Sequence, residues 1–242
     1  MLERMHNLIL SHLLRAYRDV EQLLLPSGCV HCLRLVEGSI HPAICLSCLA
    51  ELQPLHPAFG EHRILSRLRP CYIDSVEIFW AFDDVLRDAV HALKYCAMPK
   101  LGTALGEFAA RQRPELIVGL GEVVVCAIPL HRVRMRRRGY NQSALIAGGV
   151  FGEHALLNTS LLLRKKNTVT QTNLSRNERR KNVMNAFALN DAETVFGKTV
   201  VLIDDVLTTG ATLNSCARLL KKAGAAKVVG IALASPLSAE LD

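Results

Sequence analysis

Two adjacent acids followed by a turn rich in threonine and glycine form the stretch with the clearest chemistry. Residues 200–212 read VVLIDDVLTTGAT, an apolar strand pattern that delivers Asp204 and Asp205 to a turn opening into a helical pattern. Ligands of open α/β sheets bind at the carboxyl ends of strands, and a helix N-terminus offers backbone N–H groups to a phosphate. Neighbouring carboxylates can bind a sugar diol or hold a divalent cation through water. The stretch predicts a ribose 5-phosphate pocket, with the acids as ribose and Mg²⁺ ligands and the 5-phosphate at Thr208, Thr209, Gly210, Ala211 and Thr212.

Three other interpretations of this acidic stretch fit less well. A P-loop ATPase also carries acids after an apolar strand, but it needs a G-x-x-x-x-G-K-[ST] loop. The nearest match, residues 192–199, lacks the first glycine and runs into a strand pattern. Helix capping alone would need only one acid. A receiver-type phospho-acceptor site would place its acids at the ends of several strands. The ribose-phosphate pocket remains the favoured prediction.

Four cysteines near the N-terminus form two CxxC pairs separated by twelve residues: Cys29, Cys32, Cys45 and Cys48. Each pair can chelate from one tight turn, and a closed shell of four thiolates is typical of structural zinc. A redox pair would instead predict a single CxxC opening a helix. His31 and His41 are the alternative ligands. The other cysteines, at 71, 96, 126 and 216, lie among apolar neighbours and are predicted to be small buried hydrophobes.

Arginine and lysine concentrate in two stretches with almost no acid among them. Residues 131–138 read HRVRMRRR, and residues 164–181 carry seven cationic residues with one acid. Arginine matches phosphate oxygens in a bidentate manner, so we expect both stretches to be loops that bind anions. Single-stranded nucleic acid is the alternative anion, but Tyr140 alone lies beside these stretches, and base stacking usually needs more than one aromatic. Lys94 is a further candidate for reaching an anion, although a surface position is the simpler expectation for a single helical lysine.

Strand and helix patterns alternate after residue 70, as in an α/β domain with a parallel sheet. Strands are predicted at 76–82, 122–128, 199–203 and 227–234, and helices at 85–93, from 142, and at 213–223. We therefore divide the chain at residue 70, with a helix and a metal-pinned module over 1–70 and an α/β domain over 71–242. Residues 1–25 have helical apolar periodicity but neither a membrane span nor a signal peptide. A cytoplasmic protein is expected.

Charge and length agree with this picture. The 242 residues carry a formal net charge of +7, and half of them are hydrophobic. Such a chain can bury its own core, which excludes disordered, collagen-like and coiled-coil proteins. The positive charge favours anionic partners.

The sequence resembles the ComF family of competence-associated proteins, which join a four-cysteine zinc module to a type I phosphoribosyltransferase fold. The resemblance rests on the four N-terminal cysteines, on the acidic stretch, and on short motifs at 92–95, 128–131, 138–142, 170–171 and 173–176. Cys96 departs from it, because a glycine is expected after the Lys-Tyr pair. The fold expected from the resemblance is a parallel sheet flanked by helices, with an N-terminal module similar to a double zinc ribbon.

The resemblance also implies functions for individual residues. It implies that the cavity binds phosphoribosyl pyrophosphate with Mg²⁺, and that the pyrophosphate lies at Pro129, Leu130, His131 and Arg132. It assigns the basic and lid loops that close over the site to Arg134, Arg136, Arg137, Arg138, Asn141, Gln142, Gln171 and Arg176. Pentosyl transfer from this donor and a role in natural transformation, acting on incoming single-stranded DNA with other competence proteins, are the implied functions. The alternative is a non-catalytic adaptor that binds DNA or a protein. No acceptor is implied.

Overall fold

A computed structural model of the chain describes residues 28–36, 43–121, 123–153, 155–166 and 185–236. Several predictions concern residues outside these ranges: the N-terminal helix, His41, Gln171, Arg176 and residues 167–181 of the second basic stretch. Among the described residues, no helix has the length and apolar character needed to cross a bilayer.

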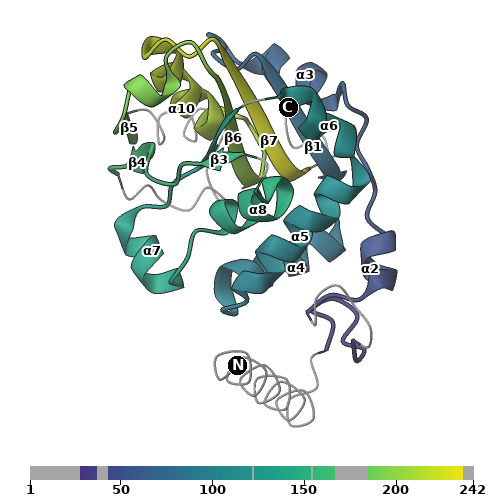
Figure 1. Cartoon of the computed structure of the whole chain (residues 1–242). Coiled ribbons are helices and arrows are strands. Elements are labelled where there is room, and N and C mark those ends of the chain that lie inside the picture. The colour runs from purple at the N-terminus through teal and green to yellow at the C-terminus, as the bar shows by residue number, and fades with distance from the viewer. Residues whose placement is uncertain (1–27, 37–42, 122, 154, 167–184, 237–242) are drawn as a thin grey trace, which may run out of the picture.

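A five-stranded parallel sheet forms the centre of the molecule (Figure 1). Its order is β1-β7-β6-β2-β3, with β1 at Ser75–Ala81, β7 at Lys227–Ser235, β6 at Thr199–Val206, β2 at Val124–Ala127 and β3 at Leu156–Leu157. The middle of β6 is buried on both faces, which is why its sequence is a continuous apolar run instead of an alternating one. The α/β fold class expected from the sequence is confirmed.

Helices cover both faces of this sheet. Helices α4 (Asp84–Tyr95), α5 (Pro99–Gln112) and α8 (Gln142–Phe151) share one core cluster with the sheet. The cluster on the other face contains α10 (Ala211–Lys222), helix α3 (Phe59–Arg63) and an antiparallel pair of β4 (Leu162–Arg164) and β5 (Phe187–Leu189). The other helices in the described ranges are α2 (Leu46–Ala50), α6 (Pro114–Leu120), α7 (Arg132–Arg138) and the short 3₁₀ turns η1 (Leu65–Arg67) and η3 (Glu193–Val195).

Helices α5 and α8 approach so closely that only glycine fits at the contact. A Cβ atom at Gly149 would lie 2.1 Å from the carbonyl oxygen of Thr103, and one at Gly106 would lie 2.3 Å from that of Ile146. Such distances are far inside van der Waals contact, so a larger residue would push the helices apart. This contact fixes α8, whose first residues reach the cavity described below.

The predicted elements are found with small changes in their bounds. The buried face expected for α4 is confirmed at Val85, Leu86, Ala89, Val90 and Leu93. Strand β6 extends past its predicted end, through both acids, because β7 pairs with it as far as Val206. The sequence patterns missed α5, α6 and the β4–β5 pair.

Two expectations were wrong. Residues 132–138 form helix α7 instead of a loop, because His131 accepts a hydrogen bond from the N–H of Val133 and Gly139 ends the helix at φ 81°. The scattered cysteines were expected to be buried, and Cys126 and Cys216 are, but Cys71 and Cys96 are exposed. Cys96 ends α4 with φ −107°, so it needs no glycine; the positive φ falls on Ala97.

The N-terminal cysteine region packs directly on the α/β body. Cys29, Ile44 and Leu49 belong to the same core cluster as Trp80 of β1. His31 Nδ1 lies 2.8 Å from Asp88 Oδ2 on α4, and the N–H of Ala81 donates to the carbonyl oxygen of Gln53. The division of the chain at residue 70 stays a prediction, and the two predicted parts share buried contacts.

Candidate functional site

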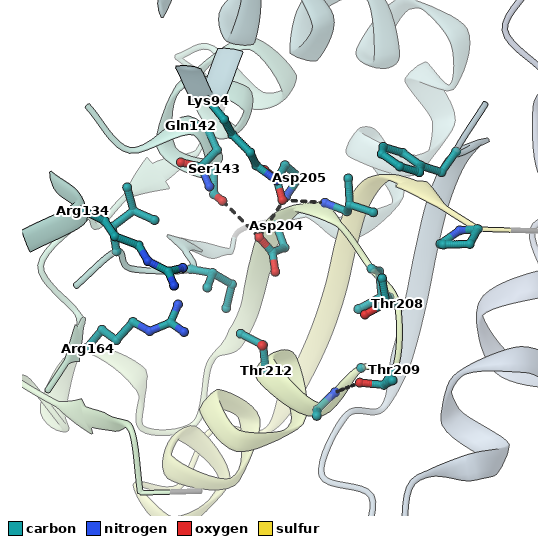
Figure 2. A pocket seen from close by; sticks show the side chains of 18 of the residues that line it. Lys94, Arg134, Gln142, Ser143, Arg164, Asp204, Asp205, Thr208, Thr209 and Thr212 are labelled. Atoms are coloured by element: carbon teal, nitrogen blue, oxygen red, sulfur yellow. Dashed lines mark hydrogen bonds and ion pairs between the residues drawn. The ribbon is translucent and has the colours of Figure 1, made fainter. Parts of the chain in front are cut away.

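A cavity of about 550 Å³ opens at the carboxyl end of strand β6 (Figure 2). Its walls come from segments far apart in the sequence, including the end of α4, helix α7, the start of α8 and the turn after β6. Such a position follows from the parallel sheet, because the strand ends and the helix starts meet at one edge. Both predicted acids and all five residues of the predicted phosphate turn line it.

The turn over 208–212 leads into the N-terminus of α10. Gly210 precedes the helix with φ 72° and, as a glycine, provides no side-chain cap from the N-cap position of α10. A Cβ atom at Gly210 would lie 2.6 Å from Cγ2 of Ile64, so both the backbone conformation and the packing require glycine there. Thr209 Oγ1 accepts from the N–H of Ala211 at 3.4 Å. The helix start suits an anion such as a phosphate.

The two acids differ in their surroundings. Asp204 Oδ1 accepts from Ser143 Oγ at 3.2 Å and from the N–H of Asp205 at 3.0 Å. Asp205 Oδ1 accepts from the N–H of Val206 at 2.8 Å, and its Oδ2 lies 2.6 Å from Lys94 Nζ. The side chain of Asp205 is 7% exposed, and that of Lys94 is 24% exposed. Asp205 is thus held by a partly buried ion pair, whereas Asp204 faces the cavity (Figure 2).

Burial raises the pKa of Asp204 to about 7. The negative charge of Asp205 contributes to this rise in pKa, and the ammonium group of Lys94 opposes it. Two carboxylates this close cannot both ionise at ordinary cost, so the pair tends to keep one proton when no cation is bound. The site therefore favours a ligand that brings a cation or hydroxyl donors. The carboxylate oxygens are also the donors that Mg²⁺ prefers.

Arginines form the opposite wall of the cavity. Arg134 and Arg138 lie one turn apart on α7, and Arg164 reaches in from β4. Figure 2 shows Arg134 and Arg164 extending toward each other on the side away from the phosphate turn. Burial lowers the pKa of Arg138 and of Arg164, but both remain charged. Converging cations in a partly enclosed space suit a multiply charged anion.

The structure divides the predicted pyrophosphate and basic residues into two groups. Leu130, Arg134, Arg138 and Gln142 line the cavity, and Arg138 Nη1 donates to Gln142 Oε1. The described cavity lining does not include Pro129, His131, Arg132, Arg136, Arg137 or Asn141.

Two of the residues outside the lining have structural contacts instead. His131 caps α7. Asn141 caps α8 through Ser143 N–H and donates from Nδ2 to the carbonyl oxygen of Ile128 at 3.0 Å. They support the segment between β2 and α8.

Lys94, Ser143 and Arg164 are among the cavity residues that the sequence analysis does not name as site residues. The sequence favours a surface position for Lys94 and places Arg164 only in a basic stretch. Lys94 belongs to the motif at 92–95 on which the family resemblance rests, and this motif is the signal that could have identified it. Ser143 and Arg164 become neighbours of the acids only through the packing of α8 and β4.

The four N-terminal cysteines converge as predicted. All four sulfurs lie within 4.8 Å of one another, with Sγ–Sγ distances of 3.7 Å for Cys29–Cys48 and for Cys32–Cys45. Four sulfurs about 2.3 Å from one zinc ion would be about 3.8 Å apart at the corners of a tetrahedron. His31 pairs with Asp88. The geometry is consistent with a closed Cys₄ zinc shell.

Comparison with known proteins agrees with the geometry. Residues 159–241 match the family model described as phosphoribosyl transferase domain. The DNA utilization protein YhgH of Salmonella typhimurium is 31% identical over 208 residues, which are 83% of this chain and 86% of that protein. Competence protein F of Haemophilus influenzae is 39% identical over 106 residues, 43% of this chain and 46% of that protein. An adenine phosphoribosyltransferase of Rhodococcus opacus is 49% identical over 43 residues, 18% of this chain and 24% of that protein. The match thus spans less than half of competence protein F.

We expect the protein to carry about one zinc ion per chain, as one Cys₄ shell requires. Cys48→Ser should remove the zinc and lower the Tm, because the short region around the cluster has little core without the metal. Elemental analysis and thermal unfolding measure both effects. Cys71→Ser, an exposed cysteine outside the cluster, is the matched control and should keep the zinc. Zinc retained by Cys48→Ser, or lacking in the wild type refolded with zinc, would contradict the assignment.

The raised pKa of Asp204 predicts a pH dependence of stability. Between pH about 4 and its native pKa of about 7, the folded protein holds a proton that the unfolded chain has released. The wild type therefore loses stability as pH rises through this window. In Asp204→Asn this ionisation is absent. The difference obtained by subtracting the Tm of the wild type from that of the variant should therefore increase by at least about 2 °C from about pH 5 to about pH 8. A pH-independent difference would show that Asp204 ionises normally.

Proposed function

Because the chain belongs to the ComF/YhgH family, whose members carry a phosphoribosyltransferase domain, we propose that its cavity binds phosphoribosyl pyrophosphate together with Mg²⁺. The observation that carries the proposal is the meeting of three different groups around one cavity. These are the acids at the end of β6, the helix start at Gly210, and the arginines of α7 and β4. A phosphorylated sugar with a second anionic group needs all three.

Each part of the donor has a chemical counterpart in the cavity. The backbone N–H groups and hydroxyls over 208–212 would bind the 5-phosphate, and the acid pair would bind the ribose hydroxyls and Mg²⁺. Leu130, Arg134, Arg138 and Arg164 would border the pyrophosphate. The resemblance places the pyrophosphate at 129–132, and in our proposal these four residues take that role, because they line the cavity and Arg132 does not.

We propose further that the protein transfers the pentosyl group. The bond between the anomeric carbon and the pyrophosphate oxygen breaks, its electron pair leaves with pyrophosphate, and an acceptor forms the new bond to that carbon. The transition state carries positive charge on the sugar, so positioning and fixed charges supply most of the catalysis. The arginine wall would stabilise the leaving pyrophosphate. No side-chain nucleophile is required.

The proposed biological role is the use of incoming DNA. Two relatives are named competence protein F and DNA utilization protein YhgH. For this chain we propose a cytoplasmic role in natural transformation or in processing incoming single-stranded DNA with other competence proteins. The Cys₄ cluster would hold structural zinc, since a closed shell leaves no open position for catalysis.

Ligand-induced stabilisation tests the proposed binding. Phosphoribosyl pyrophosphate with MgCl₂, at about a hundredfold excess over Kd, should raise the Tm by about 5 °C or more. The double variant Asp204→Asn with Asp205→Asn should lose this shift, because the groups that bind the ribose and Mg²⁺ are gone. Differential scanning fluorimetry measures it.

A matched acid on the same face of the fold serves as the control. Asp84→Asn, on the exposed start of α4, should keep the full shift. A wild type that is not stabilised by phosphoribosyl pyrophosphate, and that gives no calorimetric heat with it at millimolar concentration, would contradict the proposal.

A non-catalytic adaptor that binds DNA is the second candidate, because helix α7 presents cations in two directions. Arg132, Arg136 and Arg137 are exposed and do not line the cavity, and helix α7 contains no acid. An unneutralised cationic surface of this kind gives sequence-independent affinity for nucleic acid phosphates.

Binding of single-stranded DNA, followed by fluorescence anisotropy, separates the two candidates. If the adaptor function holds, replacing Arg132, Arg136 and Arg137 by Gln should weaken binding about tenfold or more and reduce its salt dependence. The double acid variant should bind DNA like wild type. DNA binding that is unaffected by the triple change would exclude this surface of α7.

A further inference from the structure

The ion pair between Lys94 and Asp205 joins two parts of the cavity that are 111 residues apart in the sequence. Lys94 lies in the last turn of α4, and Asp205 lies near the end of β6. Their Nζ and Oδ2 atoms are 2.6 Å apart. Because the carboxylate is almost fully buried and the ammonium group is only partly so, the pair is less screened by water than a surface pair.

The two acids differ in the contacts that their carboxylate oxygens make. Asp205 Oδ1 accepts a hydrogen bond from the N–H of Val206. Its Oδ2 has essentially no exposed surface and no aligned hydrogen bond within the described residues, but it lies 2.6 Å from Lys94 Nζ as an ion pair. Asp204 Oδ1 is engaged by Ser143 and by a backbone N–H. Within the described part of the chain, Asp204 Oδ2 has no such contact, and Figure 2 shows this carboxylate extending into the cavity. Only Asp204 therefore presents a carboxylate oxygen to a ligand.

We infer that the two acids have different roles: Asp204 contacts the ligand directly, whereas Asp205 is a positioning residue that holds the ammonium group of Lys94 at the cavity wall. This inference rests on the proposed function. It modifies the symmetrical expectation in which both acids bind the ribose. For Asp205 to contact a ligand, its buried Oδ2 would have to become exposed and shift away from Lys94, which would weaken a buried ion pair.

The place of Lys94 in the cavity indicates which part of the ligand it meets. Figure 2 shows Lys94 and Thr209 on opposite sides of the cavity, with Asp204 between them. Arg138 lies on the Lys94 side, with its guanidinium carbon 5.7 Å from the ring centre of Tyr95. A ligand whose 5-phosphate lies on the turn 208–212 would therefore direct its other anionic group toward Lys94 and the arginines. Lys94 would bind the pyrophosphate, and Asp205 would act through it.

Two ligands that differ only in the pyrophosphate test this division. Calorimetry with MgCl₂ measures the Kd of phosphoribosyl pyrophosphate and of ribose 5-phosphate. Lys94→Met and Asp205→Asn should each weaken the binding of phosphoribosyl pyrophosphate about tenfold or more, because one charge-assisted contact is lost. Both variants should leave the Kd of ribose 5-phosphate within about twofold of the wild-type value. Asp204→Asn should weaken both ligands. A merely structural role of Lys94 would affect both ligands equally.

A double-mutant cycle provides the second readout. Residues that act as a unit give non-additive losses, so Lys94→Met combined with Asp205→Asn should bind phosphoribosyl pyrophosphate about as well as either single variant. Lys94→Arg, which keeps the charge, should retain more affinity than Lys94→Met. Lys222→Met, an exposed lysine at the far end of α10, is the matched control and should bind like wild type.

The outcomes distinguish this inference from the function on which it rests. If the wild type binds neither ligand, the proposed function fails. If it binds both and the losses of Lys94→Met and Asp205→Asn add, or are equal for the two ligands, the pocket stands and the division of roles is overturned. Thermal unfolding of each variant identifies a change that only unfolds the protein, and Lys94→Arg then tests the contact in a folded chain.

Discussion

The burial of two adjacent carboxylates at the end of β6 is the constraint on which the rest of the site depends. Two negative charges in this position would repel each other and lose hydration, and the raised pKa of Asp204 reflects that cost. The protein offsets it with Lys94 and the N–H of Val206 on Asp205, and with Ser143 and the N–H of Asp205 on Asp204. The site is therefore prepared for hydroxyl donors and a cation before any ligand arrives.

Holding these partners in place explains several features of the fold. Lys94 is fixed because α4 packs its apolar face into the core shared with the N-terminal cysteine region. Ser143 is fixed because α8 lies against α5 at a distance that only glycine permits. Through His31 and Asp88, the Cys₄ region also contacts α4. The four-cysteine cluster and the cavity are thus connected by one helix, although they are far apart in the sequence.

Much of this could be predicted from the sequence. The strand before Asp204, the turn at 208–212 that leads into a helix, and the four-cysteine cluster each follow from residues with a characteristic spacing, so local patterns were sufficient to predict them. Helix α7 was taken for a loop because charge dominates its composition, and its caps at His131 and Gly139 were overlooked. The usual burial of cysteine predicts that Cys71 and Cys96 are buried. Both are exposed, because Cys96 ends α4 and Cys71 lies in the irregular segment between η1 and β1.

The sequence by itself determined which chemical groups the protein possesses: a diacid, a phosphate turn, two clusters of cations and a set of four thiolates. Only the tertiary structure decided which of these groups meet. It placed Arg134 and Arg138 at the cavity but Arg136 and Arg137 outside its lining, because one turn of helix separates the first two and the others point elsewhere. It also placed Lys94 against Asp205. Contacts between residues so far apart along the chain depend on how helices pack on a sheet, and no local pattern records that packing.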